Sequence, residues 1–235
     1  MRNYVILLAF ACVITIFPGR AQVEEKATII TYYNMTKADD EKIRLVEGKW
    51  KIFVRGEPAE AALIDIENGY IEFIDGGTGG GSTKVTVALF LAKNREPMLA
   101  EFHEYYGTGT CPDAGFLIRT CKLRQGRMAE VKDVLPAIPL DLFFKSGYDL
   151  NKIAPYMDLR RVFNKNIGYR LPRFGTMTEV FIYAGDITCS LESFGGDMAV
   201  KEREARREFL KNLLKEPVKL KWNMETGAFD PPGQG

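Results

Sequence analysis

Histidine is almost absent from this chain, which has a single one, His103, among 235 residues. A lone histidine cannot form the His-Glu-x-x-His pattern or the other paired-histidine patterns that hold catalytic zinc. The sequence also lacks the Gly-x-Ser-x-Gly segment of a serine nucleophile and the Gly-Lys-Ser/Thr ending of a phosphate-binding loop. These absences exclude the enzyme classes that depend on those signatures, and we predict no metal and no cofactor.

Net charge and long apolar runs are scarce as well. Lysine and arginine number 32 against 31 aspartate and glutamate residues, a formal charge of +1. So nearly neutral a chain has no general attraction to nucleic acid or to anionic membranes. After residue 21 the longest largely apolar stretch is 85–92, well below the roughly 20 residues that span a bilayer as a helix. We therefore expect no nucleic-acid partner and no transmembrane segment in residues 22–235.

The one longer apolar run lies at the N-terminus. Arg2 precedes the apolar residues 4–17, and residues 18–21 end the run with small residues at 19 and 21. This three-part pattern is typical of a secretory signal peptide. We predict a signal peptide over 1–21, a mature chain over 22–235, and a secreted or periplasmic location. An uncleaved anchor is the alternative, and lipidation of Cys12 is disfavoured because the apolar run continues beyond it.

Cysteines are also few. The mature chain keeps Cys111, Cys121 and Cys189, and export would place them where disulfides form. Cys111 and Cys121 flank a Pro-Asp-Ala-Gly turn signal, which favours a disulfide between them across a loop. Three cysteines allow three pairings, so Cys189 is left odd in the pairing that we predict.

The sequence does have a regular alternation of apolar and polar residues, which is typical of antiparallel strands. Asn68 and Gly69 lie between two such runs and predict a hairpin with a type I′ turn, because both residues tolerate positive φ. Short turns between the later runs predict a meander. The predicted strands cover residues 27–33, 49–55, 62–67, 70–75, 83–92, 98–106, 116–123, 127–134, 169–173, 177–184, 187–191 and 218–222.

One amphipathic helix is predicted near the C-terminus. Asp197 can cap a helix that starts at residue 198 and ends at about 215, before Pro217. The predicted fold class is therefore α+β, with predominantly antiparallel β-meander sheets and one amphipathic C-terminal helix that covers a face. Residues 22–235 form a β-rich domain in this interpretation, and a division into two lobes near residues 135–150 is the alternative.

The glycine-rich segment 76–82 is the first candidate binding feature. A β-branched strand follows it, so no helix N-terminus is present to hold a phosphate. We interpret the segment as a flexible connection between strands, with a loop that closes over a ligand as the alternative. Its candidate ligand-binding residues are Gly79, Gly80, Gly81 and Ser82.

The predicted strand at residues 98–106 carries the second candidate site. In a strand, Glu101, His103 and Tyr105 lie on one face. A carboxylate beside an imidazole can bind a metal or move protons. A solvated outer face of a half-exposed sheet is the simpler interpretation of the same pattern.

Export, a β-rich scaffold and the missing catalytic signatures together favour a non-enzymatic binding or interaction protein. Its partner would be a protein, a peptide or a glycan, and Tyr105, Tyr106, Phe143 and Phe144 could line a groove for it. Core packing is the favoured interpretation of the Phe residues. The alternative is a secreted hydrolase with a dispersed active site near His103 and Glu101. A structural subunit that pairs through an edge strand or through Cys189 is a third hypothesis.

Overall fold

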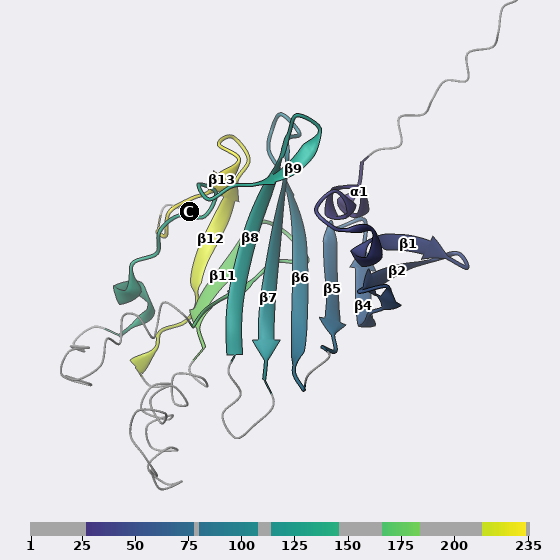
Figure 1. Cartoon of the computed structure of the whole chain (residues 1–235). Coiled ribbons are helices and arrows are strands. Elements are labelled where there is room, and N and C mark those ends of the chain that lie inside the picture. Colours follow the sequence, from purple (N-terminus) through teal and green to yellow (C-terminus); the bar gives the residue numbers. More distant parts are fainter. Residues whose placement is uncertain (1–26, 78–79, 108–113, 146–165, 184–212, 234–235) are drawn as a thin grey trace, which may run out of the picture.

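The computed structural model describes residues 27–77, 80–107, 114–145, 166–183 and 213–233. These residues form three antiparallel sheets with little helix (Figure 1). The sheets have the strand orders β1-β2-β3, β4-β5-β6-β7-β8-β9 and β10-β11-β12-β13. The elements are α1 (Ile29–Asn34), η1 (Asp39–Glu41), β1 (Ile43–Val46), β2 (Lys49–Val54), β3 (Glu57–Pro58), β4 (Glu60–Asp65), β5 (Tyr70–Asp75), β6 (Ser82–Leu91), β7 (Pro97–Tyr106), β8 (Ala114–Arg124), β9 (Arg127–Glu130), η2 (Leu140–Phe143), β10 (Ile167–Arg170), β11 (Met177–Ile182), β12 (Val218–Asn223) and β13 (Ala228–Phe229).

The six-stranded sheet is a meander in which each strand pairs with the next one in sequence. This part of the prediction is confirmed. The longest ladder joins β6 to β7, where all ten residues are paired from Ser82↔Tyr106 to Leu91↔Pro97. Long paired strands hold their side chains in fixed positions, so β7 is a rigid support for whatever its residues bind.

Both faces of the central strands are covered, each by a different part of the chain. On one face, Phe90 and Phe102 pack into a first core with residues of the four-stranded sheet. On the other face, Val87 and Leu99 pack into a second core with α1, β1 and β2. Side chains therefore alternate between two apolar environments along these strands, as the period of two requires.

Three aromatic rings connect the six-stranded sheet to the four-stranded sheet. The ring centroids of Phe90, Trp222 and Phe229 lie 5.1–5.3 Å from one another. The Trp222 indole also donates a 3.0 Å hydrogen bond to the Leu91 carbonyl. The division into two lobes near residues 135–150 stays a prediction, although this cluster contains residues from both sides of it.

The predicted strand at residues 27–33 is wrong, because these residues form the short helix α1. The Thr28 N–H donates to the Thr31 hydroxyl at 3.3 Å, and the Tyr32 N–H donates to the Thr28 carbonyl at 3.2 Å. Ile29 and Tyr33 lie one helical turn apart and are both buried in the second core. The β-branched isoleucines suggested a strand, but burial of one helical face outweighs that local preference.

The predicted hairpin at Asn68-Gly69 is confirmed, but its turn is not type I′. Asp65 pairs with Tyr70, so the loop has the four residues 66–69. Gly69 has a φ of +64°, while Asn68 is not in the positive-φ region. The Asp65 carboxylate instead accepts the Asn68 N–H at 3.1 Å. A side chain that caps the backbone in this way favours the longer loop.

Gly69→Ala is expected to cost about 2–3 kcal/mol of folding free energy, from positive φ and overpacking together. A Cβ at Gly69 would lie 3.1 Å from the Leu89 Cβ. Gly48→Ala is the control, because Gly48 has a φ of +76° but no atom within 4 Å of the added Cβ. Urea unfolding would measure both variants, and equal losses would show that the contact with Leu89 contributes nothing.

The described residues show no C-terminal helix. Most of the predicted helix, residues 198–212, lies outside the described part of the chain. At its predicted end, Leu214 forms an antiparallel bridge with Phe144. The Lys215 N–H donates to the Phe143 carbonyl at 2.9 Å. Leu214 and Lys215, at the predicted end of the helix, thus pair with a neighbouring segment. The predicted strand at 187–191 also lies outside the described residues.

The predicted disulfide between Cys111 and Cys121 is not formed, since Cys121 is free and buried in the second core. Cys111 itself lies outside the described residues. Cys121 is seven residues along β8 from Ala114, a rise of about 23 Å. Three further residues extend at most about 11 Å, whereas disulfide Cα atoms lie within about 7 Å. The predicted strand at residues 116–123 already contains Cys121, so the disulfide prediction gave too much weight to the turn signal.

Candidate functional site

Strand β7 places Glu101, His103 and Tyr105 on the face that belongs to the second core. They pair with Val87, Val85 and Thr83 of β6, respectively. The predicted shared face is therefore confirmed. The simpler interpretation as a solvated face is wrong for Glu101, which is 3% exposed. The solvated interpretation holds for Tyr105, which is 43% exposed near the C-terminal end of β7.

The Glu101 carboxylate binds two cationic or ionisable side chains through one oxygen. Its Oε1 lies 2.5 Å from the Lys37 Nζ and 2.7 Å from the His103 Nε2. Lys37 follows α1 in the chain, and its ammonium group also lies 5.0 Å from the centre of the Tyr33 ring. Both side chains of the Lys37–Glu101 pair are largely buried. The contact therefore fastens the N-terminal segment to the centre of β7.

The protonation of Glu101 follows from these contacts. Burial raises the pKa of the Glu101 carboxyl, but the hydrogen bond with His103 and the charge of Lys37 outweigh it and lower the pKa to about 2. Glu101 is therefore ionised at neutral pH. Burial and the nearby Glu101 carboxylate together raise the pKa of the Tyr33 hydroxyl.

A small apolar platform lies next to this ion pair, made of His103, Tyr105 and Leu117. The His103 and Tyr105 rings are stacked, with centroids 6.3 Å apart and planes 21° from parallel. Leu117 of β8 is directly opposite His103 and is 46% exposed. Gly115 lets the Tyr105 ring lie close to β8, because a Cβ there would be 3.3 Å from the ring. The platform is thus exposed at Tyr105 and Leu117, mostly buried at His103, and fixed on paired strands.

The candidate glycine loop reaches the same end of the sheet but not the same face. Gly79 lies outside the described residues. Gly80 has a φ of +87°, and a Cβ at Gly81 would be 2.9 Å from the Tyr106 carbonyl oxygen. Ser82 pairs with Tyr106, so its side chain is on the face opposite Tyr105. The structure therefore brings Gly81 and Ser82 beside β7 without adding Ser82 to the platform.

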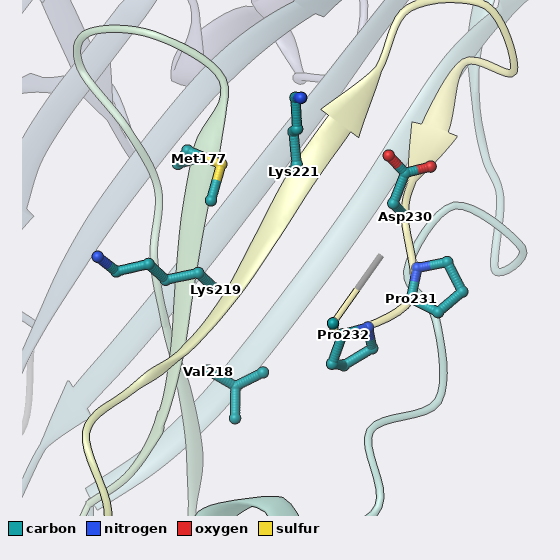
Figure 2. A pocket seen from close by; sticks show the side chains of 8 residues that line it. Met177, Val218, Lys219, Lys221, Asp230, Pro231 and Pro232 are labelled. Carbon is teal, nitrogen blue, oxygen red and sulfur yellow. The ribbon is translucent and has the colours of Figure 1, made fainter. Parts of the chain in front are cut away.

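Sequence reasoning missed Lys37, which lies 64 residues from its partner Glu101. No local pattern marks a lysine that becomes buried only when a helix packs on a sheet. It also missed a cavity of about 500 Å³ on the four-stranded sheet, shown in Figure 2. The lining residues are Met177, Val218, Lys219, Lys221, Asp230, Pro231, Pro232 and Gly233.

Within the described ranges, no group of three or more His, Cys, Asp or Glu side chains could hold a metal ion. No helix in that part of the chain is long and apolar enough to cross a membrane. Comparisons with known proteins find no matching family model, no matching curated protein and no matching solved structure. The site must therefore be interpreted from its own geometry.

Proposed function

We propose that the chain is an exported, non-enzymatic binding protein that takes a peptide or a glycan on the platform of His103, Tyr105 and Leu117. The stacked ring pair on a rigid strand, with His103 mostly buried and Tyr105 43% exposed, is the observation that carries this proposal. Aromatic side chains that keep one face open supply large contact area at low conformational cost. Peptide side chains and the apolar faces of sugars both fit such a surface.

The ion pair below the platform supports binding rather than proton transfer by Glu101. A general acid or base works best when its pKa is near the operating pH, whereas the pKa of Glu101 is about 2. Glu101 instead fixes His103, whose Nε2 it contacts at 2.7 Å. Fixing the imidazole in this way keeps the ring stacked on Tyr105 and preorganises the platform for its ligand.

The same contact is also the observation that favours the alternative, a secreted hydrolase. In that case Glu101 would orient His103 as a general base, as a carboxylate does in catalytic triads. Among the described residues, however, no hydroxyl or thiol is hydrogen-bonded to His103. A screen of ester, peptide and glycoside substrates would decide: an activity that His103→Ala abolishes would favour the hydrolase.

Tyr105→Ala is expected to weaken ligand binding at least tenfold, because central aromatic contacts dominate small interfaces. Peptide and glycan arrays would supply the ligand, and calorimetry would give the Kd of each variant. Tyr106→Ala is the matched control, since Tyr106 is adjacent and 37% exposed but lies on the opposite face of β7. The proposal is wrong if Tyr106→Ala weakens binding and Tyr105→Ala leaves it unchanged.

A further inference from the structure

The hairpin of β1 and β2, here called the arm, carries its apolar face beyond the core. Ile43 pairs with Ile52, and both are buried in the second core. On the same face, Leu45 pairs with Trp50, but these side chains are 58% and 43% exposed. Figure 1 shows the β1–β2 hairpin extending away from the six-stranded sheet. An apolar stripe therefore begins in the core and ends in solvent.

The base of the arm is firmly held, so the exposed pair is presented in a fixed position. The Asn34 amide binds both the Ile43 N–H, at 2.8 Å, and the Ile43 carbonyl, at 2.9 Å. The Gly56 N–H donates to the Asp40 carbonyl at 2.9 Å. The tight turn has positive φ at both Glu47 and Gly48, which is the type I′ geometry that suits a two-residue hairpin.

The opposite face of the arm is cationic. Arg44 pairs with Lys51, and Lys49 is the next residue on that face. Arg44 lies 4.9 Å from the Phe53 ring and so stays against the arm. Glu47 in the turn is the only acidic residue between Ile43 and Val54. The arm thus has a local positive charge, although the whole chain is almost neutral.

We propose that the arm binds an anionic membrane surface, with Leu45 and Trp50 in the interfacial layer and Arg44, Lys49 and Lys51 near the lipid headgroups. Amphipathic elements with tryptophan and leucine on one face and basic residues on the other lie at such interfaces. Tryptophan is enriched at the boundary between water and lipid. Each basic residue near an anionic surface adds to the attraction.

The small area of the apolar pair favours a membrane over a protein partner. A stable protein interface buries about 800 Å² on each partner, and two partly exposed side chains at the end of a narrow hairpin offer far less. A lipid surface needs no matching pocket, because acyl chains and headgroups rearrange around the inserted side chains. The proposed site is also separate from the platform, so the two proposals can fail independently.

The test uses the fluorescence of Trp50 in the full chain with vesicles of phosphatidylglycerol and phosphatidylcholine, or of phosphatidylcholine alone. We expect a blue shift and quenching by brominated acyl chains with the anionic vesicles only. Trp222 is buried, so Trp50→Phe should remove the quenching. Because this quenching reports on Trp50 alone, it detects insertion of the arm and does not respond to membrane binding by the apolar N-terminal residues.

Charge reversal at Lys49 and Lys51 should reduce partitioning to anionic vesicles at least tenfold. Reversal at Lys219 and Lys221 is the matched control, because these two exposed lysines have the same spacing on β12. The proposal would be overturned if the brominated lipids leave Trp50 fluorescence unquenched. It would also be overturned if charge reversal at Lys49 and Lys51 and charge reversal at Lys219 and Lys221 reduce partitioning equally. The proposal would also be overturned, in favour of a protein partner, if the chain binds acidic peptides on an array, loses that binding on Trp50→Phe, and shows no quenching of Trp50 by the vesicles.

Discussion

Glu101→Leu should destabilise the protein by about 3–5 kcal/mol, the usual cost of breaking a buried ion pair from one side. The substitution leaves the Lys37 ammonium without its 2.5 Å partner in a largely buried position. The substitution also removes the carboxylate that is hydrogen-bonded to the His103 Nε2. Denaturant unfolding followed by circular dichroism would give the difference in free energy.

The control for this substitution is an exposed ion pair. Glu225 lies 2.8 Å from Lys93, and both side chains are mostly exposed, so Glu225→Leu should cost less than about 1 kcal/mol. Lys37→Met together with Glu101→Leu should recover much of the lost stability, because an apolar pair can replace a buried ion pair. Similar costs for the Glu101 and Glu225 variants would show that the buried pair has no special role.

Protonation of the Glu101 carboxylate should also destabilise the protein in acid. The pKa of Glu101 is lowered from the ordinary value of 4.5 to about 2 in the folded protein. A lowered pKa means that the folded state favours the ionised form, so its contribution to stability is complete above pH 4.5 and is lost as the pH falls towards 2. Glu101→Leu should therefore flatten the loss of stability across this window.

Trp222→Ala should also cost about 3–5 kcal/mol, because it removes a large buried side chain and leaves a cavity. Trp222 is 3% exposed and packs against Phe90 and Phe229. Its indole N–H also bonds the Leu91 carbonyl of β6. Loss of this side chain therefore weakens both the first core and the link between two sheets.

The other tryptophan is the natural control for this experiment. Trp50 is exposed on the arm, so Trp50→Ala should cost less than about 1 kcal/mol, as surface substitutions usually do. Trp222→Phe keeps a ring but leaves the Leu91 carbonyl without its donor, and we expect an intermediate cost of about 1–3 kcal/mol. If Trp222→Ala and Trp50→Ala unfold at the same denaturant concentration, the three-ring cluster does not join the sheets energetically.

The strands could be predicted from the sequence because the alternation of apolar and polar residues is a local pattern. Alternation over residues 98–106 placed Glu101, His103 and Tyr105 on one face, and the register of β7 confirms it. The burial of Glu101 was not readable, because it depends on α1 and Lys37 packing onto the sheet from 64 residues away. Local patterns report which face a side chain occupies, but not what covers that face.

Two of the errors have different origins. Ile29 and Ile30 favour a strand locally, yet they lie in the helix α1, which packs on β1 and β7 and buries them in the second core. The turn signal between Cys111 and Cys121 suggested a short loop, whereas β8 begins at Ala114 and carries Cys121 away from that turn. The fold of the isoleucines is decided by tertiary contacts, which no window of sequence around them contains. The extent of β8 is a local feature, and the predicted strand at residues 116–123 already places Cys121 within it.

The most direct test of the binding site is the pKa of Glu101, measured by carboxyl carbon NMR over an acid titration. We expect an ionised, structural Glu101 that fixes His103 beneath the platform to have a pKa below the ordinary 4.5, at about 2. A catalytic acid would require a pKa near the operating pH. A value at or above the ordinary 4.5 would contradict the account of Glu101 as a structural carboxylate.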